Sequence, residues 1–345
     1  MKEEKFELLR KKSIELNDRA RRQMNGETER FVSAYYRSPL EYYDALAEAH
    51  AAGFDNYPAA HVNPDPIFFM EKLMGCRMRF ADGIQDFFHT FCVPLIEKPG
   101  DIDKVKIDLP NHPLWNAMTE SLAWHTQSEA GALPVFLPSF APLDTACAVM
   151  GVCDFLELLA DDPAGAEHIL AFITNLYIEM IVSIHSLKVR TVNAVGYPGT
   201  YVSDLNTVNL SPKTLERIIP FYERAAEHAG GMTVNIAVPD IGLMGDIVSV
   251  PAFHSFFFDA RLNPVDIAKI LGKKLFIIYS YIYDDGLDGV TLKNGEYVNP
   301  IVSAHSRNAA EIIGALEGHS VLTALFRFTK REAVQDAETL RRLGK

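Results

Sequence analysis

Several classes of protein are excluded by what the sequence lacks. No apolar run approaches the roughly 20 residues that cross a membrane, and the first residues are charged and amphipathic rather than signal-like. The net charge is -12, with 33 Lys and Arg against 45 Asp and Glu, so the basic excess that favours nonspecific binding to nucleic acid or to an anionic membrane is missing. We therefore expect a cytoplasmic protein that binds neither.

Short motifs that mark common sites are missing too. The chain has no G-x-G-x-x-G and no G-x-x-x-x-G-K-[ST], which excludes the simplest nucleotide-binding sites, and no H-E-x-x-H, which excludes one common zinc site. The four cysteines, Cys76, Cys92, Cys147 and Cys153, form no C-x-x-C pair. Because no secretory signal supports a disulfide framework, we predict reduced and mostly buried thiols.

What the chain does contain predicts an α/β protein. Its 345 residues can bury a large core. Helical periodicity predicts helices over residues 1 to 24, over Pro39–Ala52, from Asp144 and over Pro163–His185. Apolar runs rich in branched or aromatic residues predict strands at Val135–Phe140, Val189–Val195, Met232–Val238, Ser255–Phe258, Lys274–Tyr279 and Val321–Phe328. Strands that alternate with helices favour a parallel sheet, and both a (β/α)8 barrel and a doubly wound sheet fit this order.

The stretch from Gly196 to Ala237 carries the clearest pattern. Ser211-Pro212 opens a helix as an N-cap followed by proline, Gly230-Gly231 ends it, and an apolar run of strand length follows. This order resembles the uroporphyrinogen decarboxylase-like superfamily, which includes the decarboxylase of haem synthesis and the cobamide-dependent methyltransferases. The resemblance implies a single (β/α)8 TIM barrel at residues 41–345, preceded by an N-terminal helical extension at residues 1–40, in a homodimer.

The chain also departs from that superfamily. Where the methyltransferases carry the zinc ligands His-x-Cys, this chain reads Asn235-Ile236-Ala237, so we expect no metal. The arginine-rich Arg-Gln-x-x-Gly-Arg run of the decarboxylases is missing. Their Gly-Asn-x-Asp-Pro is replaced by the segment from Tyr279 to Asp285.

Asp65 is the residue to which the resemblance assigns catalysis. It lies in Asn63-Pro64-Asp65-Pro66, where two prolines restrict the backbone around one acid. In the decarboxylases the corresponding aspartate binds pyrrole N–H groups, which a carboxylate can do as an acceptor of several hydrogen bonds. An aspartate in an ordinary proline-rich turn is an equally good interpretation.

Further residues are predicted to bind substrate. Tyr201 and Ser203 lie in a glycine- and hydroxyl-rich segment, Tyr197–Asn209, which we expect to be a pocket-lining loop. Asp144 is expected to cap the helix that it opens. The residues predicted to line the substrate pocket are His61, Asn63, Tyr201, Ser203, Asn235 and His254, with Arg77, Arg79 and Arg261 as weaker candidates for binding carboxylates.

Three functions fit these observations. The first is a decarboxylase, a carbon–carbon lyase, that acts on a tetrapyrrole or a related small molecule without a cofactor. The second is a corrinoid-dependent methyltransferase without the zinc site, or a non-catalytic barrel that binds a corrinoid protein as its partner. In this second case the corrinoid is a substrate or is carried by the partner protein. A different enzyme on the same barrel is the third, because a fold does not fix a function.

Overall fold

The chain divides into two compact units in a computed structural model. The structure describes residues 2–36, 38, 40–61, 68–80, 90–193, 196–236, 241–257, 264–281, 316–327 and 330–343. Unit 1 comprises Met1–Pro58, Ala194–Tyr197 and Val238–Lys345, and unit 2 comprises Ala59–Asn193 and Pro198–Ala237. The predicted site residues Asn63 and Asp65 are not among the residues that the structure describes.

Unit 1 is built on parallel strands. These are β1 (Arg30–Tyr36), β11 (Val321–Arg327), β10 (Leu275–Tyr281) and β9 (Phe253–Phe257), which pair in that spatial order. Its helices are α1 (Lys2–Met24), α2 (Tyr42–Ala51), α9 (Met244–Ser249), α10 (Pro264–Leu271) and α12 (Lys330–Leu343), with the 3-10 turn Ile241–Leu243. Helices α2 and α12 pack against β1 in a small core. Four alanines allow this close approach around the ring of Phe54, and they are Ala34, Ala49, Ala333 and Ala337.

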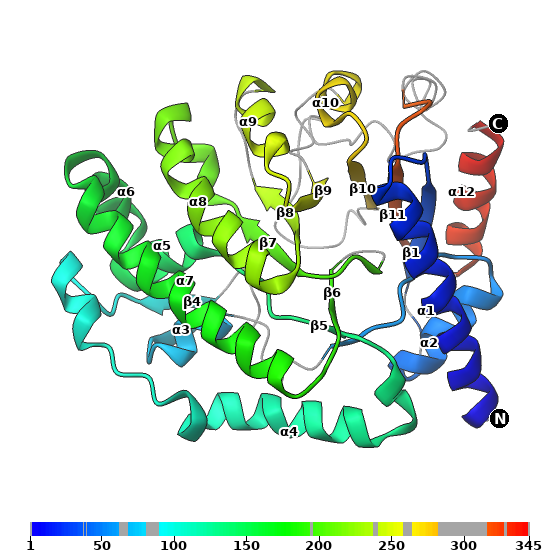
Figure 1. The fold of residues 1–345 in the computed structure, drawn as a ribbon, viewed down its shortest axis with the longest axis horizontal. Coiled ribbons are helices and arrows are strands. Elements are labelled where there is room, and N and C mark those ends of the chain that lie inside the picture. The colour runs from blue at the N-terminus through cyan, green and yellow to red at the C-terminus, as the bar shows by residue number, and fades with distance from the viewer. Residues whose placement is uncertain are drawn as a thin grey trace. The chain divides into compact units, whose positions relative to one another are not determined.

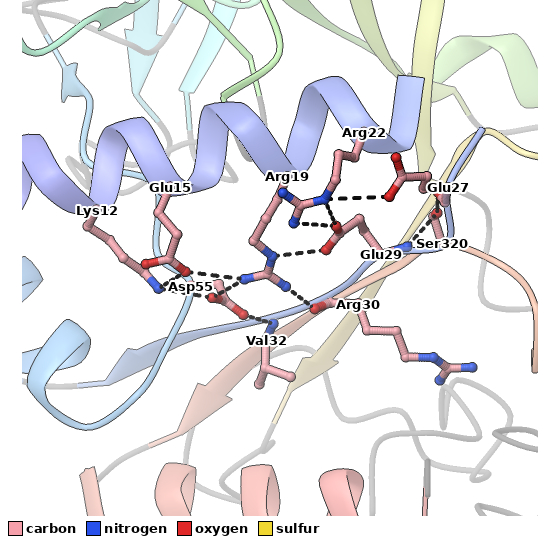
Figure 2. A network of polar contacts seen from close by, with 10 residues as sticks. All are labelled: Lys12, Glu15, Arg19, Arg22, Glu27, Glu29, Arg30, Val32, Asp55 and Ser320. Atoms are coloured by element: carbon pink, nitrogen blue, oxygen red, sulfur yellow. Dashed lines mark hydrogen bonds and ion pairs between the residues drawn. The ribbon is translucent and has the colours of Figure 1, made fainter. Parts of the chain in front are cut away.

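An ionic network fixes α1 to the start of β1 (Figure 2). The Arg19 guanidinium lies between two carboxylates, 3.0 Å from Glu29 Oε2 and 2.7 Å from Asp55 Oδ1, and 4.4 Å above the ring of Phe31. Asp55 also accepts the Val32 amide N–H at 3.0 Å. Because these charges are largely buried and oppositely paired, the network holds the helix in one register on the strand.

Unit 2 also contains parallel strands. β2 (Ala60–His61), β5 (Val135–Phe136) and β6 (Thr191–Val192) pair in that order, and β7 (Thr200–Asp204) pairs with β8 (Met232–Ile236). A bridge between Phe140 and Val202 brings the chain after β5 beside β7. An antiparallel hairpin of β3 (Arg77–Phe80) and β4 (Thr90–Val93) completes the strands described here.

The helices of unit 2 are α3 (Phe69–Leu73), α4 (Pro113–Gln127), α5 (Pro142–Met150), α6 (Val152–Asp161), α7 (Pro163–Ser186) and α8 (Pro212–Ala229). The 3-10 turns are Pro99–Lys104, Leu109–Asn111, Glu129–Ala132 and Asn206–Asn209. Helices α6, α7 and α8 lie side by side (Figure 1). Against the expectation that no segment approaches a membrane span, α7 is long and apolar enough to cross one by length and composition, but half of its most apolar window is buried among its neighbours, as in a core helix.

The structure confirms the parallel α/β organisation and corrects several details. The predicted strands are present, although β5 and β6 are shorter than expected, and α8 has Ser211 as its N-cap and Gly230 at its end. The segment expected to be a loop, Tyr197–Asn209, contains strand β7. Residues 1–40, predicted to be a helical extension, hold β1 as well as α1. The described strands do not trace a closed barrel.

Candidate functional site

Three of the predicted pocket residues meet on one face of β7 and β8. The Asn235 side-chain amide donates a hydrogen bond to the Tyr201 hydroxyl at 2.6 Å and lies 3.4 Å from Ser203 Oγ. All three side chains are half-buried. The amide therefore fixes the positions of two hydroxyl groups. Ser203 and Asn235 are the residues before the last of their strands, near the carboxyl ends where the ligands of parallel α/β proteins bind.

Strand geometry explains why these side chains converge. Along β7 burial alternates, with Thr200, Val202 and Asp204 buried and the two residues between them half-buried. Successive side chains of a strand point to opposite faces, so Tyr201 and Ser203 share one face. Ser203 lies directly opposite Asn235 in the register of β7 and β8, within reach of a cross-strand contact.

Ser203 also borders a cavity of about 140 Å³. A cavity of this size has room for several water molecules or a small ligand. Its polar and aromatic lining consists of two acids, three hydroxyl residues and two phenylalanines: Glu71, Asp144, Ser139, Thr145, Ser203, Phe68 and Phe69. Phe68 has φ 54°, a left-handed conformation that is rare for a large side chain.

Glu71 is a buried acid on the cavity wall. Its side chain is 6% exposed, and its Oε1 accepts the Thr145 hydroxyl at 2.7 Å. Burial raises the pKa of Glu71, and the negative charge of Asp144 raises it further, while the Thr145 hydrogen bond and the positive charge of Lys72 oppose the shift. The cavity wall thus contains a carboxyl group that burial makes harder to ionise.

Two carboxylates tie the segment after β5 to the end of β7. Asp204 is fully buried and accepts the amide N–H groups of Leu143 at 3.1 Å and Asp144 at 2.7 Å, so it caps the start of α5. The Asp144 carboxylate in turn accepts the amide N–H groups of Leu205 and Asn206, both at 2.9 Å. This reciprocal pair fixes both cavity-lining loops.

The Asp144 result corrects the prediction that this residue caps its own helix. Asp204 caps the helix instead, and the Tyr222 hydroxyl donates a further hydrogen bond to Asp204 Oδ2 at 2.6 Å. Burial and the neighbouring Asp144 raise the pKa of Asp204, against the opposing effect of Tyr222 and the two amides.

The other predicted residues have different outcomes. His61 ends β2, but its side chain lies outside the described residues, as do Asn63, Asp65 and Arg261. His254 belongs to β9 of unit 1, where its ring stacks on Tyr197 with 5.9 Å between centroids. Arg77 and Arg79 are exposed on β3 and do not line the cavity.

Sequence reasoning missed Glu71, Thr145 and Asn193, and it took Asp204 as a polar residue of the expected loop Tyr197–Asn209 and not as a buried acid. Asn193 follows β6 directly, is 1% exposed, and its Oδ1 is without a hydrogen-bond partner among the described residues. An acid that directly follows three apolar residues, Phe68, Phe69 and Met70, was the available signal for Glu71.

The residues present do not fit the zinc site of the methyltransferases that the sequence resembles. Among the residues that the structure describes, no group of three His, Cys, Asp or Glu side chains is placed to hold a metal. Where those enzymes have a zinc-binding histidine, Asn235 donates its amide hydrogens to two hydroxyl groups. An amide engaged in this way does not replace an imidazole as a zinc ligand.

No family model and no curated protein matches the chain. A solved structure does resemble it. A methyltransferase from Methanosarcina mazei superposes with a TM-score of 0.60 at 15% sequence identity, over 87% of this chain and 83% of that one. At this identity the similarity concerns the fold.

Proposed function

We propose that this protein is a methyltransferase that binds its substrate in the cavity of unit 2. The observation that carries the proposal is the hydrogen-bonded set of Tyr201, Ser203 and Asn235 on one face of two parallel strands, with Ser203 on the cavity wall. The fold shared with a methyltransferase supports this choice over decarboxylation. The same comparison supports the (β/α)8 barrel as our proposed architecture for the chain.

The residues have distinct roles in this proposal. Asn235 is a positioning residue that orients the two hydroxyl groups, and Ser203 offers its hydroxyl to the ligand. During transfer the bond between the methyl group and its carrier breaks, the electron pair stays with the carrier, and a lone pair of the acceptor forms the new bond. Following the resemblance, we propose that a corrinoid is the carrier, as substrate or on a partner protein, and that the enzyme is a cytoplasmic homodimer.

The lining of the cavity argues against a tetrapyrrole carboxylate as substrate. Decarboxylases of the resembling superfamily pair substrate carboxylates with arginine. Among the described residues that line this cavity there is no Arg or Lys, and the charged members are Glu71 and Asp144. Like charges repel, so a polycarboxylate would bind here at a cost.

Methyl transfer from methylcobalamin to thiol acceptors tests the proposal. We expect the purified protein to convert methylcobalamin above the protein-free rate, and Asn235→Ala to lower kcat/KM by about tenfold or more, since misplaced catalytic groups cost rates of this order. Asn116→Ala, on the exposed face of α4, is the matched control and keeps full activity. Absence of turnover with every acceptor would refute the proposal.

Chelator treatment separates this reaction from a zinc-thiolate one. Because β8 carries Asn235 and not a zinc-binding histidine, we propose that activity persists after dialysis against a strong chelator. Loss of activity that zinc alone restores would show that a metal site outside our assignment is required.

A further inference from the structure

Three sulfur atoms lie together on one face of the β3–β4 hairpin. Met78 is directly opposite Cys92 in the antiparallel register, and Cys76, two residues before Met78, shares that face because successive side chains of a strand alternate. The Cys92 thiol lies 3.9 Å from the Met78 thioether sulfur and forms a hydrogen bond with the Cys76 thiol. We call Cys76, Met78 and Cys92 the sulfur cluster.

The sulfur cluster is anchored on one side and open on the other. Cys76 is 8% exposed, and its amide N–H donates a hydrogen bond to the Glu71 carbonyl oxygen at 2.9 Å, which attaches the start of β3 to the end of α3. Met78 and Cys92 are half-buried. Two of the three sulfur-bearing side chains therefore reach solvent, so a small ion can approach the cluster while the hairpin stays folded.

The spacing of the sulfur atoms fits the coordination of a single metal ion. Three ligands that each lie about 2.3 Å from a shared centre, the length of a metal–thiolate bond, are about 4 Å apart when they surround it in a plane. The distance of 3.9 Å between the Cys92 and Met78 sulfur atoms agrees with this value. Little movement of the side chains is needed to place an ion between them.

The types of ligand select a soft ion. Thiolate and thioether sulfur atoms favour Cu(I), whereas a structural zinc site takes four ligands from thiolates, imidazoles and carboxylates. Within the part of the chain that the structure describes, no three His, Cys, Asp or Glu side chains are grouped to supply such a set. A cluster of two thiols and one thioether therefore fits Cu(I) better than zinc.

A disulfide between the two cysteines is the competing role for this pair. The hydrogen bond with Cys76, burial and the negative charge of Glu71 raise the pKa of Cys92. A protonated thiol is a poor nucleophile and oxidises slowly, which disfavours a disulfide. A metal ion, by contrast, deprotonates the thiols that coordinate it outright.

We propose that the sulfur cluster binds one Cu(I) ion, with Cys76 and Cys92 as thiolate ligands and Met78 as a thioether ligand. The two thiols release their protons to solvent as the ion binds, and copper stays in the same oxidation state. The cluster does not line the cavity of unit 2, so the ion has no part in the proposed methyl transfer.

Anaerobic titration of the full-length protein with Cu(I), in competition with the chromogenic chelator bathocuproine disulfonate, tests this site. Over a series of chelator concentrations, we expect the protein to withdraw one equivalent of copper. Cys92→Ser keeps the size of the side chain and removes a thiolate, and it should weaken copper binding by at least about tenfold. Cys153→Ser, at the exposed thiol of α6, is the matched control and binds copper as the unaltered protein does.

A second pair of variants tests the thioether. Met78→Leu retains apolar volume, and it should weaken copper binding by about threefold or more, a smaller loss because a thioether is the weakest of the three ligands. Met24→Leu, at an exposed methionine at the end of α1, should change nothing. Unchanged affinity in Met78→Leu would overturn the assignment of the thioether.

Alkylation of the unaltered protein gives a readout that does not depend on the folding of any variant. One equivalent of Cu(I) should protect Cys92 from iodoacetamide and leave Cys153 reactive, as measured by mass spectrometry of the peptides. Equal copper retention by the unaltered protein and Cys92→Ser would overturn the proposal and show that the three sulfur atoms only pack together. Protection of Cys153 in place of Cys92 would overturn it too.

Discussion

The hydrogen bond between Tyr222 and Asp204 gives the sharpest test of how the cavity loops are held. Tyr222 and Tyr177 are both fully buried, at 0% and 1% exposure, and both rings contact Phe140. Their hydroxyls differ in the acceptor. Tyr222 donates to the Asp204 carboxylate at 2.6 Å, and Tyr177 donates to the Pro138 carbonyl oxygen at 2.7 Å. Replacing each by phenylalanine removes one oxygen from a matched environment.

The magnitude follows from the acceptor. A hydrogen bond to a charged group contributes about 1.5–3 kcal/mol, so Tyr222→Phe should lower the free energy of unfolding by about 2 kcal/mol when Asp204 is ionised. The folded-state pKa of Asp204 is raised, so its contribution to stability is complete below its unfolded pKa and is lost as pH rises through the folded pKa. Because Tyr222 opposes that rise in pKa, the penalty of Tyr222→Phe should grow with pH. The penalty of Tyr177→Phe, whose partners do not titrate, should stay constant.

Urea unfolding of both variants at several pH values between about 5 and 9 measures this difference. The slope of unfolding free energy against urea concentration should be the same for all three proteins, which confirms that stability alone has changed. A Tyr222→Phe penalty that is independent of pH, or a pH dependence shared equally by Tyr177→Phe, would refute the assignment of Asp204 as a buried titrating cap.

Three other predictions concern features away from the cavity wall. Arg19→Met should cost about 2 kcal/mol in unfolding free energy, because it removes the cation between two carboxylates that are 12% and 13% exposed and leaves Glu29 with Arg22 alone and Asp55 with Lys12 alone. Arg21→Met at an exposed pair should cost less than about 1 kcal/mol, and equal losses would contradict the role of the network. Gly199→Ala should lower the free energy of unfolding by at least about 2 kcal/mol, because φ is +124° and the added carbon would overlap a backbone carbonyl group. Gly245→Ala, with open space around it, should not destabilise the protein. Thermal unfolding of the two variants measures the difference. Burial lowers the pKa of Lys274 to about 8, so its contribution to stability is complete above an unfolded pKa of about 10.4 and is lost as pH falls through about 8. The wild-type protein should therefore gain stability as pH rises between these two values, and Lys274→Met should remove that gain. An unchanged pH profile of stability in the variant would contradict the burial effect.

The elements that the sequence predicted well are those with local signals. Helix α8 begins after Ser211, whose hydroxyl accepts the Thr214 amide at 3.2 Å, and ends at Gly230 with φ +83°, so both ends are determined by residues at the ends themselves. Strand β7 was missed because its flanking glycines and hydroxyl residues resemble a loop. Its alternating burial depends on a partner strand about 30 residues further along the chain, which composition does not encode.

The candidate site shows the same limit. Tyr201 and Ser203 could be named from sequence because they lie in a glycine- and hydroxyl-rich segment, and Asn235 because it takes the place of a zinc ligand in the superfamily that the chain resembles. The buried acids could not. Glu71 meets Thr145 across 74 positions, and Asp204 meets the amides of α5 across about 60, so only the folded chain shows which carboxyl groups lose water and which donors replace it.

The two units stabilise their buried carboxylates with different partners, which are cations in unit 1 and neutral hydrogen-bond donors in unit 2. In unit 1, Arg19, Arg22 and Lys12 together pair with Glu29 and Asp55, so these two carboxylates are held by cations. In unit 2, Asp144, Asp204 and Glu71 are held by amides and hydroxyls, which supply hydrogen bonds but no net charge. Such an arrangement is costly unless a cation or a proton compensates it. Burial raises the pKa of Glu71 and of Asp204, so a proton is the compensation that their surroundings favour.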